Sequence, residues 1–210
     1  MLTEKFDAAL LFAADLHRKQ ARKGTGTPYF GHLLAVAALV IDDGGSEDEA
    51  IGALLHDSIE DQGQHYPGGR EALRTYIREQ FGSAVADIVD ACTDDEGLSK
   101  ESMGTPQEDR ARWLERKQAY VDGIGHKTAQ ALRVTAADKV HNAESILDAY
   151  SAIGPEIWNR FRTRSRADQT DVYEALSRAI DSRNRALVAC ERTRLPERLL
   201  RAVGLMKELA

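Results

Sequence analysis

The chain has 210 residues, of which 42% are hydrophobic and 30% charged, and its formal net charge is −6. This length suits one well-cored domain and is small for two. The negative charge argues against a large nucleic-acid surface, which needs concentrated basic charge, but permits a small phosphorylated ligand. No apolar run approaches the roughly 20 residues that span a bilayer, and the N-terminus lacks the order of a signal peptide. We therefore expect no membrane contact and a cytoplasmic location.

The first 62 residues show the apolar spacing of amphipathic helices. Three helices are predicted there, over residues 3–19, 29–43 and 46–62. A polar loop with two glycines, 20–28, separates the first two helices, and Gly44-Gly45 ends the second. Ser46 begins the third helix, because Glu49 follows three residues later and completes a capping box.

Helical periodicity continues through the rest of the chain. Further helices are predicted over 70–81, 83–91, 108–124, 127–150, 155–161 and 168–194, with a last one beginning at Pro196. The stretch 93–107 reads as a long polar loop, of the kind that is often functional. Convincing strand alternation is absent, so the sequence predicts an all-α helical bundle over 1–182 with a C-terminal helical extension over 183–210.

The segment from His56 to Asp61 contains four ionisable side chains, namely His56, Asp57, Glu60 and Asp61. On a continuous α-helix they fall within an arc of about 140°. Three of them are acids near the C-terminal end of the predicted helix, where the helix dipole disfavours negative charge. Like charges this close repel unless a cation relieves them. A divalent metal is one explanation, and a solvated acidic helix end is the alternative.

Two other side chains extend this cluster to a possible metal site. His32 stands near the start of the second helix, and Asp138 lies in an otherwise apolar helical segment. Either residue alone is usually a hydrogen-bonded core residue. Together with His56 and Asp57 they form a His₂Asp₂ set, which suits manganese, iron, zinc or nickel and does not distinguish them. A catalytic site of this kind keeps open positions for water and phosphate.

The order H…HD…D resembles that of the HD phosphohydrolase superfamily. In finer detail the chain resembles the hydrolase domain of RelA/SpoT proteins and the stand-alone small alarmone hydrolases, over about residues 1–180. The matching motifs are Phe12-Ala13-Ala14, Arg22-Lys23-Gly24-Thr25-Gly26-Thr27-Pro28-Tyr29, His32, Ala53-Leu54-Leu55-His56-Asp57-Ser58-Ile59-Glu60-Asp61, Thr93-Asp94 and Ala137-Asp138-Lys139-Val140-His141-Asn142. HD alone is unspecific, whereas HD-x-x-ED with the upstream Arg-Lys-Gly loop is quite specific.

The resemblance implies a role for each matching residue. The four metal ligands of the family match His32, His56, Asp57 and Asp138. The pair thought to position or deprotonate the attacking water matches Glu60 and Asp61. The substrate contacts match Arg22, Lys23 and Asn142, with Tyr173 as a further residue that stacks on the ribose or base. The cofactor is a divalent transition metal, and we predict manganese.

The implied reaction removes the 3′-diphosphate of guanosine tetra- or pentaphosphate and releases pyrophosphate. We expect hydrolysis only, because no synthetase domain is recognisable. Gln62 departs from the family pattern, in which we expect threonine, and the loop over 93–107 is unusually long. Alternatives left open are the adenosine counterpart as substrate, an HD nucleotidase acting on nucleoside monophosphates, and a nucleotide sensor without turnover. The expected partner is a small nucleotide, and both a monomer and a homodimer remain open.

Overall fold

The computed structural model describes residues 1–93 and 104–209. Within these residues the regular structure is helical, and the β structure is one isolated bridge between Ala21 and Pro28. The all-α prediction is therefore confirmed. The chain forms two compact units, of which the first comprises Met1–Thr93 and Thr128–Asp138. The described residues of the second unit are 104–127 and 139–209, and the division at residue 182 stays a prediction.

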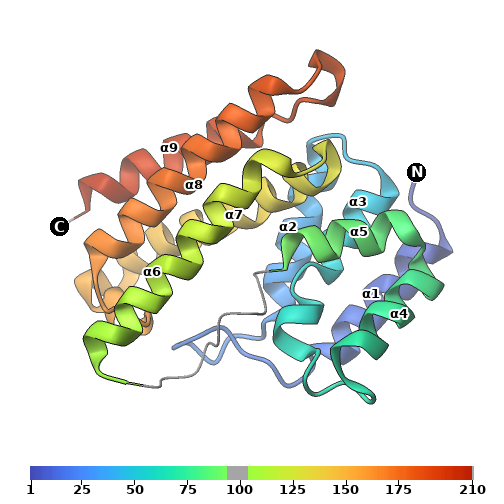
Figure 1. Ribbon diagram of the computed structural model, residues 1–210, viewed down its shortest axis with the longest axis horizontal. Helices are drawn as coiled ribbons and strands as arrows, with labels where there is room; N and C mark the ends of the chain where they lie inside the picture. The colour runs from blue at the N-terminus through green and yellow to red at the C-terminus, as the bar shows by residue number, and fades with distance from the viewer. Residues whose placement is uncertain (94–103, 210) are drawn as a thin grey trace. The chain divides into compact units, whose positions relative to one another are not determined.

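Five α-helices and a π-helical turn make up most of the first unit (Figure 1). They are α1 (Glu4–Leu16), α2 (Phe30–Asp42), α3 (Glu47–Leu55), η1 (Ser58–Gln62), α4 (Gly69–Phe81) and α5 (Ser83–Cys92), joined by the start of α7 (Ala129–Ile153). Helix α3 is central, because it packs against α1, α2 and α5 and is buried from residue 49 to its end. Gly52 permits the close approach of α5, since a Cβ there would lie 2.6 Å from Cγ2 of Ile88.

Side-chain caps begin several of these helices, as the sequence indicates. The predicted capping box of α3 is confirmed, with the Ser46 hydroxyl accepting from the Glu49 amide and the Glu49 carboxylate accepting from the Ser46 amide. Thr3 caps α1. A second capping box, from Thr105 and Glu108, starts α6 at Pro106 and so two residues before the predicted position. Of the predicted loop over 93–107, residues 94–103 lie outside the described residues.

The second unit is built mainly from α6, α8 and α9 and the later part of α7 (Figure 1). Its elements are α6 (Pro106–Gly123), η2 (Ile124–His126), η3 (Gly154–Arg160), α8 (Arg166–Ala186), η4 (Ala189–Glu191) and α9 (Leu195–Glu208). Helix α8 packs against both α6 and α9. The prediction of one helix over 168–194 is wrong beyond Ala186. There the Asn184 side chain hydrogen-bonds both the N–H and the C=O of Thr193, each at 3.0 Å, and so fixes a turn in place of a further helical turn.

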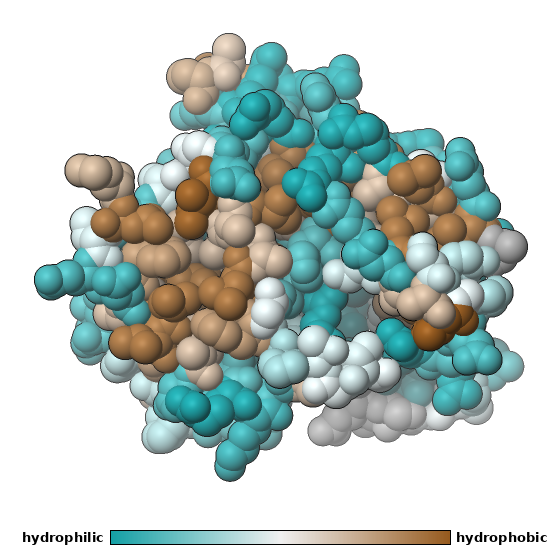
Figure 2. Space-filling view, turned by 180° about the vertical axis from the view of Figure 1, so that it is seen from behind, coloured by the Kyte–Doolittle hydropathy of each residue, from teal (hydrophilic) through white to brown (hydrophobic). Residues whose placement is uncertain are grey.

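Some large apolar side chains remain on the surface. In the first unit these include Leu11, Leu34 and Ile41, with exposed fractions of 71%, 42% and 39%. Figure 2 shows hydrophobic residues spread over broad areas of the face in view. Helix α2 therefore carries more apolar side chains than the core of its own unit buries. None of the helices in the described residues combines the length and apolar character required to cross a membrane.

Candidate active site

The four residues predicted as metal ligands come together in the first unit. His32 lies in the first turn of α2, His56 and Asp57 follow the end of α3, and Asp138 is on α7. Both histidines are 2% exposed and Asp138 is 6% exposed, while Asp57 is half-buried. Charged groups are rarely buried this deeply without a partner, because losing their hydration is costly. Three separate elements thus bring two imidazoles and two carboxylates to one buried position.

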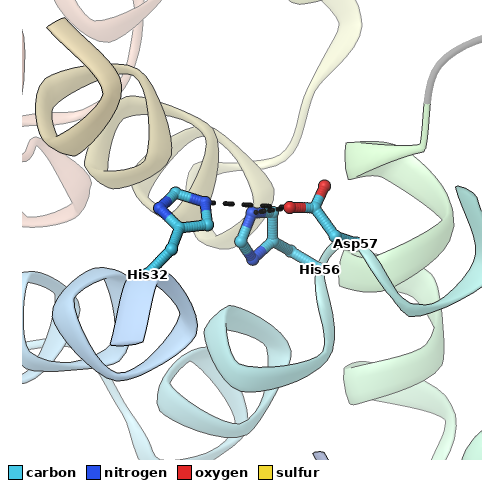
Figure 3. A group of neighbouring side chains, drawn as sticks. All are labelled: His32, His56 and Asp57. Carbon is cyan, nitrogen blue, oxygen red and sulfur yellow. Dashed lines mark ion pairs between the residues drawn. The ribbon is translucent and has the colours of Figure 1, made fainter. Parts of the chain in front are cut away.

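The atoms that face one another are the potential ligand atoms themselves. Nε2 of His56 lies 2.9 Å from Oδ2 of Asp57, and Nε2 of His32 lies 3.7 Å from the same oxygen (Figure 3). Oδ1 of Asp138 lies 3.2 Å from Nε2 of His32 and 3.7 Å from Nε2 of His56. Ligand atoms bound to one transition metal lie roughly 3 Å apart, since each metal–ligand distance is about 2.0–2.2 Å. The spacing of the four side chains therefore fits a single metal ion.

Hydrogen bonding around His56 supports the same role. Its Nδ1 lies 2.8 Å from the carbonyl oxygen of Ala53, so Nδ1 carries the proton and donates it. This leaves the lone pair of the neutral ring on Nε2, the buried atom that faces the carboxylates of Asp57 and Asp138. A backbone carbonyl that fixes the tautomer in this way is typical of metal-binding histidines.

The electrostatics of the cluster favour a cation at its centre. Burial disfavours a charged His56, but Asp57 and Asp138 outweigh burial and raise its pKa well above the usual value. Burial also opposes ionisation of Asp57, yet the neighbouring His56 holds the pKa of that carboxyl below its usual range. Burial lowers the pKa of His32, so that ring is neutral. The two carboxylates that stabilise a proton on His56 would stabilise a metal cation in its place.

The HD-x-x-ED segment does not form the single α-helix that we predicted from the sequence. Helix α3 ends at Leu55, and Ser58–Gln62 form the π-helical turn η1. Such a turn contains one more residue per hydrogen-bonded ring than an α-helix and is frequent at functional sites. The arc of about 140° was expected for a continuous α-helix, so it stays a prediction for these four side chains. Glu60 and Asp61 belong to a separate element from the metal-ligand pair.

Asp61 lies beside an open cavity of about 630 Å³. The lining residues are Asp15, Leu16, Arg18, Lys19, Gln20, Asp61, Gln62 and His65. Oδ2 of Asp61 accepts a hydrogen bond of 2.7 Å from Nε2 of Gln20, a residue to which sequence reasoning gave no role. Water can reach Asp61 through this cavity, as a proton acceptor in hydrolysis requires. Glu60, its neighbour on η1, is half-buried.

Tyr29 is a second functional candidate that sequence reasoning missed, since it was noted only as part of a motif. Its hydroxyl donates a short hydrogen bond to Oδ2 of Asp57, the oxygen that faces both histidines. Burial raises the pKa of Tyr29 far above its usual value, so the hydroxyl keeps the proton that it donates. Its ring packs against His17 and His32, with centroid distances of 5.7 and 5.3 Å, and the Arg22 guanidinium lies 5.9 Å from its centroid.

The loop that carries Arg22 and Lys23 is tightly turned. The amide of Arg22 donates to the carbonyl of Thr27 at 2.8 Å, and Gly24 and Gly26 both have positive φ angles, of 72° and 68°. Glycine adopts this conformation without the strain that a Cβ would cause. Lys23 is exposed and Arg22 is half-buried. The loop therefore holds two cations in the same unit as the metal-ligand cluster.

The remaining two predicted substrate contacts belong to the second unit. Asn142 lies on α7, one helical turn after Asp138, and Tyr173 lies on α8. Both side chains are half-buried. Their contact with a nucleotide stays a prediction, as does the chemical role of every other site residue.

Comparison with known proteins identifies the class to which this fold and cluster belong. A family model described as the HD domain matches residues 9–176, which is most of the chain. The chain belongs to the HD domain family, whose members are metal-dependent. The chain therefore carries a His–Asp cluster within a domain of a metal-dependent family, with His32, His56 and Asp57 grouped together and Asp138 beside both histidines.

The relatives narrow the class further. The chain is 32% identical over 166 residues to guanosine-3′,5′-bis(diphosphate) 3′-pyrophosphohydrolase MESH1 of Xenopus tropicalis, covering 75% of this chain and 79% of that protein. It is 31% identical over 156 residues to the MESH1 of Homo sapiens, covering 73% of each. Among solved structures, a metazoan ortholog of SpoT that hydrolyses ppGpp has the same fold, with a TM-score of 0.70, 20% identity and coverage of 98% of this chain and 97% of that chain.

Proposed function

We propose that this protein is a metal-dependent hydrolase that removes the 3′-diphosphate of guanosine 3′,5′-bis(diphosphate) and its pentaphosphate counterpart. The observation that carries the proposal is the buried cluster of His32, His56, Asp57 and Asp138, whose facing atoms lie 2.9–3.7 Å apart. It occurs in a chain that is 32% identical to a protein named for this reaction. The same four residues would hold the metal, for which we propose manganese.

The reaction adds one water across the bond between the 3′ oxygen of the ribose and phosphorus. The water oxygen bonds to phosphorus, the 3′ O–P bond breaks, and one proton of the water ends on the 3′ hydroxyl of GDP or GTP. Asp61 accepts that proton first, and Glu60 helps to orient the water. A divalent metal, when bound, stabilises the negative charge that develops on the phosphate.

Recognition of the nucleotide is assigned to the cations and aromatic residues around the cluster. Arg22 stacks on the base, because a planar guanidinium packs well against an aromatic ring, and Lys23 faces phosphate as a compact charge. Asn142 contacts the ribose or phosphate, and Tyr173 stacks on the ribose or base. The partner is thus a small nucleotide, and a cytoplasmic location and a monomeric or homodimeric state stay predictions.

A nucleotide panel tests the proposal. Protein reconstituted with manganese is incubated with guanosine 3′,5′-bis(diphosphate), its adenosine counterpart and nucleoside monophosphates, and pyrophosphate and phosphate are measured separately. We expect pyrophosphate from the guanosine substrate. Release of phosphate from monophosphates alone would assign a nucleotidase, and binding without any release would assign a sensor.

The Asp61→Asn variant links turnover to the proposed proton acceptor. It keeps the size of the side chain but removes most of its basicity, so we expect kcat to fall by about 10²–10⁴-fold. Manganese content, measured by elemental analysis, should stay at the wild-type level. Parallel loss of metal would make Asp61 a ligand, and full activity would give it no chemical role.

A further inference from the structure

A chain of hydrogen bonds leads from the end of α1 to Asp61. Gln20 is at its centre, and its backbone is fixed on both sides, since its N–H donates to the carbonyl of His17 and its C=O accepts from Tyr29, each at 2.9 Å. Its side chain donates from Nε2 to Oδ2 of Asp61 at 2.7 Å. Its Oε1 lies 2.6 Å from Nδ1 of His17 and 2.5 Å from Nε2 of Gln62.

The orientation of the Gln20 amide is determined by the chemistry of its three partners. An ionised carboxylate only accepts hydrogen bonds, so the NH₂ group of Gln20 must face Asp61. The carbonyl oxygen of Gln20 then faces Gln62 and accepts from its Nε2. Nδ1 of His17 then carries the proton, because it lies beside the same oxygen. If the Gln20 amide were flipped, its NH₂ group would face the NH₂ group of Gln62 and its carbonyl oxygen would face the carboxylate of Asp61.

Burial strengthens this arrangement. His17 is 1% exposed and its ring stacks on that of Tyr29, so it is a rigid anchor for Gln20. Burial lowers the pKa of His17 despite its bond with Gln20, which keeps the ring neutral. Gln20, Asp61 and Gln62 are half-buried and all line the cavity. Gln62 is the residue that stands where we expected threonine from the family pattern, and here it supplies one of the two anchors.

We propose that Gln20 is a positioning residue, whose amide holds the Asp61 carboxylate in the orientation that accepts a proton from the attacking water. Gln62 and His17 act one step further back, by fixing the amide itself. This inference rests on the proposed function for the role of Asp61. Errors of about 1 Å in a reacting group can cost on the order of 10²-fold in rate. Among the described residues the side chain of Gln20 hydrogen-bonds Asp61, Gln62 and His17 and none of the four residues of the metal-ligand cluster, so we expect metal binding to survive its replacement.

The test compares Gln20→Met with a matched control. Gln118→Met is suitable, because it removes an amide that donates to an aspartate, Asp122, at 2.8 Å on the exposed surface of α6. With manganese and guanosine 3′,5′-bis(diphosphate), we expect Gln20→Met to lower kcat by about 10- to 100-fold, with KM changed less than about threefold. Manganese affinity, measured by isothermal titration calorimetry, should stay within about twofold of wild type. The control should match wild type in all three quantities.

A double-mutant cycle shows whether Gln20 acts through Asp61. If it does, Gln20→Met has no further effect on kcat in an Asp61→Asn protein, since residues that act as a unit are not additive. Gln62→Met keeps Gln20 and His17 in contact, so it should lower kcat by about threefold to tenfold. It also keeps the test possible should Gln20→Met fold poorly.

The outcomes separate the two proposals. No pyrophosphate release by the wild-type protein overturns the proposed function, and this inference with it. Turnover by Gln20→Met within twofold of wild type overturns the inference alone. So does an equal loss of metal affinity and activity, which would make Gln20 a structural residue.

Discussion

Tyr29 offers a sharp test of the candidate metal centre, because a single oxygen atom separates it from phenylalanine. Its hydroxyl donates to Oδ2 of Asp57, and the same oxygen lies 2.9 Å from Nε2 of His56 and 3.7 Å from Nε2 of His32. Tyr29→Phe removes this donor and keeps the ring that packs against His17 and His32. The change therefore alters the support of one ligand oxygen and leaves the surrounding packing in place.

The expected magnitude follows from the charge of the acceptor. A hydrogen bond to a charged group contributes about 1.5–3 kcal/mol, and about 1.4 kcal/mol corresponds to a tenfold change in an equilibrium constant. Losing a residue that orients a metal ligand typically weakens metal binding by about 10- to 100-fold, which agrees with that energy. We expect the manganese dissociation constant of Tyr29→Phe to rise by this factor.

The measurement is a calorimetric titration of metal-stripped protein with manganese. Tyr76→Phe is the control, because Tyr76 belongs to the same unit but packs against Phe12, at a centroid distance of 4.8 Å, and takes no part in the metal-ligand cluster. Unchanged affinity in Tyr29→Phe, with an intact circular dichroism spectrum, would refute the argument. An equal loss in the control would refute it as well, since the effect would then be general.

Two further substitutions probe the framework of the two units. Arg133→Met removes the arginine that pairs with both Asp43 and Glu49, whose side chains are only 4% and 5% exposed. We therefore expect the free energy of unfolding to fall by about 3–5 kcal/mol and the melting temperature to fall by roughly 6–20 °C. Adding Asp43→Asn and Glu49→Gln to this variant should restore much of the lost stability, measured by calorimetry. If stability is not restored, the unpaired buried carboxylates are not the cause. Asn184→Ala removes both hydrogen bonds to the Thr193 backbone, so we expect the free energy of unfolding measured in urea to fall by about 1–3 kcal/mol. A decrease below about 0.5 kcal/mol would show that these two hydrogen bonds are not needed for stability.

Much of the fold can be predicted from the sequence because its helices carry local signals. Ser46 and Glu49 mark the start of α3 through contacts within four residues, and Gly44 marks the end of α2. The end of α8 has no such local signal. It depends on Asn184 reaching Thr193, nine residues away, and residues 187–194 would suit a helix equally well.

The candidate site also contains some features that the sequence predicts and others that it does not. His32, His56, Asp57 and Asp138 are recognisable because their spacing matches a family motif, and the structure brings all four together. The π-helical turn was missed, since an apolar periodicity cannot distinguish bonds across four residues from bonds across five. Gln20 was missed for a different reason. A glutamine in a polar loop is unremarkable until the fold places it beside Asp61, 41 residues away.

The π-helical turn also makes the site easy to dissect by protein engineering. Residues after such a turn are offset by one position from a regular helix, and each helical position corresponds to a rotation of about 100°. Inserting one residue between Asp57 and Glu60 would advance Asp61 by one position and rotate it away from Gln20. The ligand pair His56-Asp57 precedes the insertion. Under the roles proposed above, the result would be a receptor that binds metal and nucleotide without hydrolysing the nucleotide, suitable as a reporter of its concentration.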